Sequence, residues 1–476
     1  MFLAVWANRY GEIEETKNHT ALGRTGNSHV IMEPDALIPL PASSELHFLP
    51  GRTPLGTNRR SGKIEEIRIA SGIYGKSEET SSVSAVLPPG YTRTYVPSFK
   101  NRQQATTLPF FAYTAVSYKL PRRKLQGSPS GKFVLRNELP ERAGICHSEG
   151  IEESPYEILR DAQDDCGVFQ SQNKDERLYV AAIRTEDNYR WDVSQFNSRD
   201  LDNKIKSILK AFPKNRILRH LSNCSRKYRC LTAQNIFYQR WEGGIPVSTR
   251  CNARCVGCIS LQSSHLPPSP QSRIGFKAET EEVVEIAVPH LEAPDAIVSF
   301  GQGCEGEPTL LGDLLEKSIK KIRSKTSRGT ININTNGSKT EVIARLAGAG
   351  LDSMRVSLNS AVPEHYKLYF RPVDYSFDDV KASIKTAREK GVFVSLNLLV
   401  MPGVTDNENE LKALVEFARD CSVNMIQLRN LNIDPDLYFR MIKLPQGRSI
   451  GILNMIETFK KELPEVRIGN FTPALR

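Results

Sequence analysis

Short apolar stretches alternate with amphipathic stretches of helical periodicity from about residue 245 to residue 431. The apolar stretches are AIVSF (296–300), TININ (330–334), SMRVSL (353–358), VFVSLNLLV (392–400) and MIQLRN (425–430). The helical stretches lie around 311–323, 340–348, 376–390 and 408–420. With one more strand just before residue 251, the series makes about six β/α units, which predicts a parallel sheet with right-handed crossovers.

The expected strands are apolar at alternate positions and polar at the positions between them. Met354, Val356 and Leu358 alternate with Arg355, Ser357 and Asn359. The other polar positions are Asn332, Asn334, Asn336, Ser395, Asn397, Gln427 and Arg429. A parallel strand covered by helices on both faces is apolar on both faces. These strands therefore have one face that contacts water or a ligand. The pattern predicts a partial barrel with helices outside and a polar, ligand-holding cavity inside, with its site at the carboxyl ends of the strands.

The first 240 residues give a weaker pattern. AYTAVSY (112–118) and LYVAAIR (178–184) predict two strands that pair as a hairpin. The polar connection 119–177 is too long for a compact unit, so we interpret it as a flexible insertion in which Cys146 and Cys166 are incidental. Residues 1–35 show weak periodicity, and we expect little regular structure there. The expected domains are an N-terminal accessory domain (1–240), a core (241–435) and a C-terminal extension (436–476).

Length and composition indicate a globular protein of two or three domains. The chain has 476 residues, of which 39% are hydrophobic and 25% are charged. The first apolar stretch, MFLAVWA, is too short for a signal peptide or a bilayer span, so we expect a cytoplasmic protein with no membrane partner. The odd number of cysteines, nine, does not fit a disulfide framework.

The chain is basic, with a formal net charge of +10. Two runs, 204–229 and 317–328, are rich in Lys and Arg. Such runs could attract RNA, DNA or an acidic protein. We favour the alternative of solvated helix faces, because no nucleic-acid-binding motif accompanies the charge.

Three cysteines are packed into eight residues, CNARCVGC, at Cys251, Cys255 and Cys258. A structural zinc site needs four ligands, and the nearest histidine, His265, lacks the spacing of a zinc finger. Three thiolates suit an iron–sulfur cluster. Such a cluster with only three protein ligands keeps one iron open to a substrate or cofactor.

This motif after a first strand resembles the radical S-adenosylmethionine (radical SAM) superfamily. GEP (306–308), after the second strand, is similar to that family's Gly-Gly-Glu motif. NTNG (334–337), VSLNSA (356–361), NLLVMPGVTDN (397–407) and IQLRNLN (426–432) are similar to the ends of the third to sixth strands. The resemblance covers about 190 residues, with all motifs in family order. It implies an α/β fold: a partial (β/α)6 barrel, flanked here by an N-terminal α+β domain and a short helical C-terminal extension.

The resemblance also implies cofactors and site residues. Cys251, Cys255 and Cys258 would hold a [4Fe-4S] cluster whose open iron binds SAM. The reduced cluster would cleave SAM, and the resulting 5'-deoxyadenosyl radical would abstract hydrogen from a substrate. Gly306 and Glu307 would lie along the methionine amino group. Candidates for the SAM ribose or carboxylate are Asn334, Asn336, Ser357 and Asn359, while Gln427 and Arg429 would reach the adenosine or the substrate. The implied partner is a one-electron donor of the flavodoxin or ferredoxin type.

The local sequence GQGCEGEP departs from the family pattern, because Glu305 stands where the first glycine is usual. If the motif acts through its backbone, Glu305 is tolerated; if that glycine needs a positive φ, the loop must differ. Cys304, with Cys224 and Cys230, raises the hypothesis of an auxiliary cluster. The alternative is that these are buried free thiols.

The sequence leaves the substrate open among small molecules, peptides, proteins and RNA. GQGCEGEP and RNLNIDPDLY (429–438) are similar to a bacterial subgroup of the superfamily, which indicates no substrate. Asn430, Asn432 and Asp434 could meet substrate or form a helix cap. Residues 366–375 could form a lid or pack on the outer helices, and we expect His290 and His365 to be structural. The rival hypothesis is a non-catalytic iron–sulfur or zinc protein whose basic surface binds nucleic acid.

Overall fold

The computed structural model describes residues 2–7, 13–41, 44–49, 52–70, 77–78, 80–101, 114–119, 177–262, 269, 271–431 and 433–476. The expected insertion, apart from its two end residues, lies outside the described residues. Cys146, Cys166, His265 and Asn432 lie outside them as well.

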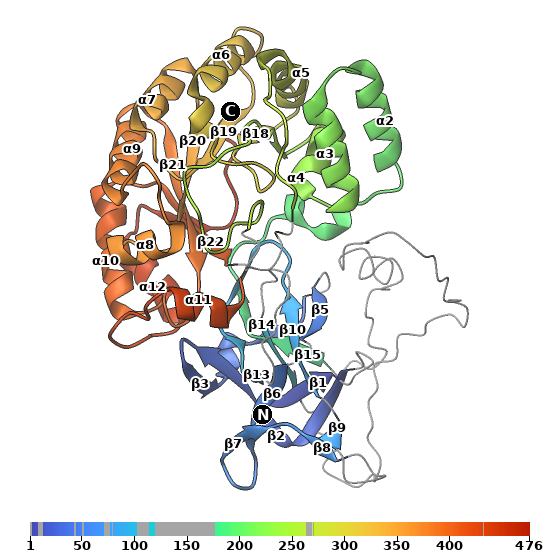
Figure 1. Cartoon of the computed structure of the whole chain (residues 1–476), viewed down its shortest axis with the longest axis vertical. Helices are drawn as coiled ribbons and strands as arrows, with labels where there is room; N and C mark the ends of the chain where they lie inside the picture. The colour runs from blue at the N-terminus through green and yellow to red at the C-terminus, as the bar shows by residue number, and fades with distance from the viewer. Residues whose placement is uncertain are drawn as a thin grey trace.

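The C-terminal half is a curled, seven-stranded parallel sheet in which each strand pairs with the next in chain order. Its strands are β17 (Glu242–Gly244), β18 (Ile297–Phe300), β19 (Thr330–Thr335), β20 (Ser353–Leu358), β21 (Phe393–Val400), β22 (Met425–Asn430) and β23 (Arg467–Gly469). The helices are α5 (Thr280–Leu291), α6 (Gly312–Arg323), α7 (Thr340–Ala349), α8 (Pro363–Phe370), α9 (Phe377–Glu389), α10 (Glu408–Asp420), α11 (Pro435–Met441) and α12 (Ile452–Glu462). Helices α5, α6, α7, α9 and α10 follow the outer side of the sheet (Figure 1). The partial barrel predicted from the sequence is confirmed.

The seventh strand was not expected. Residues 436–476 were predicted to be helical, and α12 lies there, but β23 adds a parallel strand beside β22. Three residues, RIG, carry too little hydrophobic pattern to indicate a strand.

The alternation along the strands separates core from lumen as predicted. Met354, Val356 and Leu358 of β20 are fully buried in the apolar core. Arg355, between them, bonds only to polar side chains of other strands. Period-two alternation thus sends one side of each strand to the helices and the other to a polar interior.

The N-terminal half is built on a mixed-length sheet of twelve strands with a central order β13-β6-β2-β1-β10-β14-β15-β4. Its strands are β1 (Phe2–Ala7), β2 (Ile13–Thr25), β3 (Ser28–Ile31), β4 (Ile38–Pro39), β5 (Glu45–Leu49), β6 (Arg52–Asn58), β7 (Ile64–Glu66), β10 (Ser81–Val86), β12 (Val96–Pro97), β13 (Phe99–Asn101), β14 (Thr114–Lys119) and β15 (Arg177–Val180). Two small pairs are β8 (Ile69–Ala70) with β9 (Ser77–Glu78), and β11 (Tyr91–Arg93) with β16 (Ala182–Arg184).

One prediction for this half is confirmed and one is wrong. Strands β14 and β15 pair antiparallel, with Val116 opposite Val180, as the predicted hairpin requires. The expectation of little regular structure in residues 1–35 is wrong, because β1 lies inside the sheet between β2 and β10. Strand β1 is apolar at nearly every position and buried on both sides, so it shows no alternation to read.

Three helices connect the two halves: α2 (Leu201–Ala211), α3 (Arg216–Lys227) and α4 (Leu231–Tyr238). Their buried residues, including Ile205, Leu221 and Phe237, belong to the same apolar cluster as the barrel. In Figure 1 they stand beside α5, and α4 packs against β17, the first strand of the sheet. Their basic run is partly neutralised, since Arg216 pairs with Glu282 and Arg226 with Asp202. No helix in the described ranges is both long enough and apolar enough to cross a bilayer.

Candidate active site

The three-cysteine loop follows β17 and is held against the chain that leaves α8. Arg254 donates its N–H to the Phe370 carbonyl and Val256 to the Tyr369 carbonyl, both at 2.9 Å. Val373 donates to the Asn252 carbonyl at 3.0 Å. Residues 366–375, for which a lid and simple packing were both considered, therefore pack on the cysteine loop and fix its path.

The three thiols are free and lie close enough to influence one another. Burial and the nearby Glu307 carboxylate raise the pKa of Cys251 to about 11. Burial, and then the charges of Cys258 and Cys251, raise the pKa of Cys255 far above its usual value. Three thiolates beside a carboxylate need a cationic ligand, and bound iron supplies that charge.

The spacing of the three thiols is wider than a single metal ion requires. A tetrahedral ion with metal–sulfur bonds of 2.3 Å holds its sulfur ligands roughly 3.8 Å apart. Among the described residues, Cys251, Cys255 and Cys258 do not form a group whose ligand atoms all lie within 4.8 Å of one another. The donor set therefore fits a multi-iron cluster, in which each thiolate takes a different iron.

The Gly306–Glu307 backbone pairs with the stretch just before the cysteines. Gly306 donates its N–H to the Ser248 carbonyl at 2.8 Å, and Glu307 donates to the Arg250 carbonyl at 2.9 Å. A Cβ on Gly306 would lie 2.0 Å from the Arg250 carbonyl oxygen, although its φ is outside the left-handed region. Glycine is required here for close approach.

Glu305, the departure from the family pattern, is a buried brace. Its carboxylate accepts backbone N–H groups from Val247 at 2.8 Å and from Ser248 at 2.9 Å. It also accepts from Gly301 and Gln302. Burial raises its pKa to about 7 although these bonds favour the charged form. The sequence left two possibilities open: the motif acts through its backbone, or the position needs a positive φ. Glu305 does not have a positive φ, which supports the first.

Glu307 is buried between the cysteine loop and the end of β19. Its carboxylate accepts hydrogen bonds from both Thr309 and Thr335 hydroxyls at 2.6 Å, and from the Asn336 N–H at 2.8 Å. Burial raises its pKa. Among the described residues its hydrogen bonds come from uncharged groups, which leaves its charge available to an ammonium group.

The structure brings Asn336 to the cysteine loop and Asn334 into the lumen. The Asn336 amide donates to the Asn252 side chain at 2.9 Å. The Asn334 amide oxygen accepts from Arg355 at 2.6 Å and from Asn332 at 3.0 Å.

Two buried arginines dominate the lumen. Arg355 pairs with Glu242 at 2.7 Å and donates to Gln427 at 3.1 Å. Arg429 donates to the same Gln427 oxygen at 2.8 Å and to Asn397 at 3.1 Å. Burial and the charge of Arg355 lower the pKa of Arg429 to about 9. Glu242 is the carboxylate hydrogen-bonded within this network, and Glu186 also acts electrostatically on Arg429. The Arg429 guanidinium itself donates to amide oxygens, so it could also bind an anion.

Ser357 and Asn359 differ in their surroundings. Ser357 is half-buried on β20 and has no side-chain hydrogen bond within the described part of the chain. Asn359 is fully buried, and its amide donates to the His365 carbonyl of α8 at 3.4 Å. Ser357 is thus open to a ligand, whereas Asn359 bonds into the strand-to-helix turn.

Sequence reasoning missed Glu242 and Arg273. Glu242 precedes the cysteine motif on the short β17, where no alternation marks it. Arg273 lies fifteen residues beyond Cys258 in sequence and donates to its sulfur at 3.7 Å. Only the charge of these residues beside the motif could have indicated them. His290, expected to be structural, is buried and bonds to the Trp241 carbonyl at 2.9 Å.

The N-terminal sheet docks at the carboxyl ends of β21 and β22. Arg52 and Arg24 form ion pairs with Asp434 and Asp436. The Asn430 side chain accepts from the Arg93 N–H and donates to the Tyr91 carbonyl, both at 2.9 Å. Asn430 and Asp434, considered as substrate contacts or as a helix cap, therefore serve this contact. Asp434 also caps α11. The N-terminal half covers this side of the barrel mouth (Figure 1).

A curled parallel half-barrel with a buried three-thiol loop at the end of its first strand defines an α/β protein built for an iron–sulfur site. The Radical SAM superfamily model matches residues 245–417. These residues form a domain of the radical SAM superfamily. Its members are enzymes that use SAM with a [4Fe-4S] cluster, and the Cys251, Cys255 and Cys258 donor set fits that cluster.

Curated relatives share the core. The mitochondrial GTP 3',8-cyclase of Arabidopsis thaliana is 30% identical over 196 residues, which are 41% of this chain and 47% of that protein. The GTP 3',8-cyclase of Petrotoga mobilis is 30% identical over 213 residues, 43% of this chain and 56% of that protein. This chain thus spans about half the length of these relatives.

Solved structures show similarity over a comparable part. Methylornithine synthase PylB has a TM-score of 0.35 at 14% identity, covering 56% of this chain and 74% of that one. The structure of anSMEcpe with bound AdoMet has a TM-score of 0.34 at 16% identity, covering 48% and 63% of the two chains.

Proposed function

We propose that this protein is a radical SAM enzyme that abstracts hydrogen from a substrate held in the barrel lumen. The observation that carries the proposal is the buried loop of Cys251, Cys255 and Cys258, with Glu307 beside it and a polar lumen below. When bound, a reduced [4Fe-4S] cluster supplies the electron that cleaves SAM reductively and so generates the hydrogen-abstracting radical.

The protein's own residues bind and orient SAM. Because Gly306 has no side chain, its backbone can lie close to Arg250, and this contact keeps the cysteine loop in place. Glu307 offers a buried negative charge to the methionine ammonium. Ser357, which has an unused hydroxyl, and Asn336, which touches the cysteine loop, are the better-placed candidates for the SAM ribose or carboxylate.

The lumen selects an anionic substrate. Within the described residues, the Arg429 side chain donates hydrogen bonds to the amide oxygens of Asn397 and Gln427, so a phosphate or carboxylate would form a strong charge-assisted bond there. A small molecule, a peptide, a protein segment or RNA could each carry this group. GTP is the first compound to test, because the similar proteins from Arabidopsis and Petrotoga carry that substrate in their names.

The electron donor would be a flavodoxin or a ferredoxin. A chain of net charge +10 attracts an acidic donor and speeds its encounter. The cluster thiolates need a reducing compartment, which supports a cytoplasmic location.

The test is SAM cleavage by the anaerobically reconstituted protein with a chemical reductant. We expect 5'-deoxyadenosine from the wild-type protein and a loss of at least a hundredfold in the Cys255→Ala variant. Cys421→Ala, which removes a buried thiol of another region, is the matched control and should retain activity. A wild-type protein that holds a full cluster but forms no 5'-deoxyadenosine would favour the rival, a non-catalytic metal protein that binds nucleic acid.

A further inference from the structure

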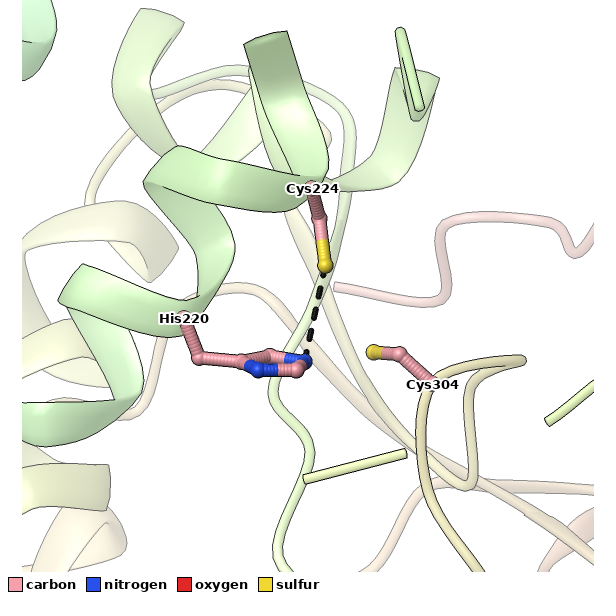
Figure 2. Close-up of side chains that lie close together, drawn as sticks. All are labelled: His220, Cys224 and Cys304. Carbon is pink, nitrogen blue, oxygen red and sulfur yellow. Dashed lines mark hydrogen bonds between the residues drawn. The ribbon is translucent and has the colours of Figure 1, made fainter. Parts of the chain in front are cut away.

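A second group of metal-binding side chains lies outside the three-cysteine loop. His220 and Cys224 lie one turn apart on α3, and Cys304 lies on the loop that follows β18 (Figure 2). The His220 Nε2 and the two sulfur atoms all lie within 4.8 Å of one another. The Cys224 sulfur is 3.4 Å from His220 Nε2. Two distant parts of the sequence thus point three soft donor atoms at one position.

Simple packing of thiols does not account for this arrangement. An i, i+4 spacing places two side chains on the same face of a helix, and here that face meets a third ligand. Cys224 is 1% exposed and Cys304 is 5% exposed, so neither serves as a nucleophile for a substrate in solvent.

We propose that His220, Cys224 and Cys304 bind a zinc ion, with Cys230 as the fourth ligand. Sulfur and imidazole donors in a closed tetrahedral set are typical of structural zinc. Ligand atoms within 4.8 Å of one another match a single ion, in contrast to the wider spacing of the three-cysteine loop.

Cys230 stands near enough to complete the set. Its N–H donates to the Cys224 carbonyl at 3.2 Å, so the two backbones adjoin. Its sulfur lies 3.3 Å from the Thr232 hydroxyl and outside the 4.8 Å group. A rotation of its side chain on metal binding would bring it in.

The sequence raised the hypothesis of an auxiliary iron–sulfur cluster at Cys224, Cys230 and Cys304. The zinc proposal replaces that hypothesis. Cys224, Cys230 and Cys304 do lie together in the fold, but His220 joins them, and the close spacing favours a single ion.

The ion would fix the loop that carries Glu305 and Glu307. Cys304 directly precedes these residues, whereas His220 and Cys224 belong to a helix outside the barrel. Metal binding at neutral pH would release the thiol protons and join α3 to the SAM-binding side of the sheet. The proposal concerns structure and does not depend on SAM cleavage.

The test is metal analysis of the full chain, purified anaerobically with the Cys251, Cys255 and Cys258 positions changed to alanine. This background removes the other thiol cluster, where zinc could bind adventitiously. We expect about one zinc per chain, retained with Cys421→Ala and reduced at least tenfold by Cys224→Ala or Cys304→Ala. Cys230→Ala should weaken zinc retention against a chelator.

A measurement on the unmutated chain covers the case in which a variant fails to fold. Zinc-edge X-ray absorption of the reconstituted protein should show sulfur ligands at about 2.3 Å with at least one nitrogen ligand. Less than a tenth of a zinc per chain, with no uptake on titration with Zn²⁺, would overturn the proposal. Iron retained by the triple-alanine background in place of zinc would overturn it as well, in favour of an auxiliary cluster.

Discussion

Single residues decide how the cysteine loop meets the second strand. Position 306 requires glycine, because a Cβ there would lie 2.0 Å from the Arg250 carbonyl oxygen. The sequence indicates this requirement through a glycine next to Glu307. Glu305 is different, because its role depends on four backbone N–H groups from two separate stretches. A sequence shows that Glu305 departs from the family pattern, but it cannot show which groups the carboxylate satisfies.

Restoring the family glycine at this position should damage the protein. Glu305→Gly removes the side-chain acceptor of two buried and two partly buried backbone N–H groups, and a buried N–H group left unsatisfied costs about 1–3 kcal/mol. We expect the free energy of unfolding in urea to fall by roughly 3 kcal/mol or more, with Glu416→Ala, an exposed carboxylate on α10, changing it by less than about 0.5 kcal/mol. A glycine variant as stable as the wild type would show that Glu305 is no brace.

At the scale of elements, strand alternation was the most informative signal. In four of the strands it predicted the polar lumen, because one face of each strand of a half-barrel faces the interior. The parallel sheet of about six β/α units was predicted from the series of apolar and helical stretches. Alternation failed where pattern is short or absent: β23 has three residues, and β1 is apolar throughout. It also grouped Asn359 with the lumen, whereas that residue lies beyond the end of β20 and bonds to α8.

His290 of α5, which bonds to the Trp241 carbonyl just before β17, predicts that the stability of the protein depends on pH. Burial lowers the pKa of His290 from 6.5 to about 4, so the unfolded chain takes up the proton first as the pH falls. The stability from this residue is fully present above pH 6.5 and is lost as the pH falls toward 4, by about 3 kcal/mol in all. His290→Gln should lack this loss, which parallel urea titrations between pH 7 and pH 4.5 would measure. Identical pH profiles would contradict it.

At the scale of the whole molecule, the N-terminal sheet covers the β21–β22 side of the barrel mouth. Nothing in the sequence indicated that contact, because Arg24 and Arg52 lie about 400 residues from Asp436 and Asp434. Long-range ion pairs leave no local pattern. The domain boundaries at 240 and 435 stay predictions, although α2–α4 share the apolar core of the barrel.

Breaking the buried Arg52–Asp434 pair should weaken the contact between the N-terminal sheet and the barrel. Asp434 pairs with Arg52, whose side chain is only 2% exposed, and removing one charge of a buried ion pair costs up to about 3–5 kcal/mol. Asp434→Asn keeps the cap of α11 and should lower stability by up to about that amount. It should also speed hydrogen exchange at Gly26, whose N–H bonds to the Pro402 carbonyl across this contact at 3.1 Å. Asp187→Asn breaks an exposed pair with Arg184 and should cost less than about 1 kcal/mol. Equal losses of stability in the two variants would show that the Arg52–Asp434 pair contributes no more than an exposed ion pair.

The central claim is that the cluster held by Cys251, Cys255 and Cys258 has an open iron at which SAM binds. The most direct measurement is the EPR spectrum of the reduced, reconstituted protein with and without SAM. The account predicts a [4Fe-4S]⁺ signal whose g values shift when SAM is added, and whose coupling to ¹⁵N appears when the methionine amino group is labelled. A cluster signal that SAM leaves unchanged would contradict the account.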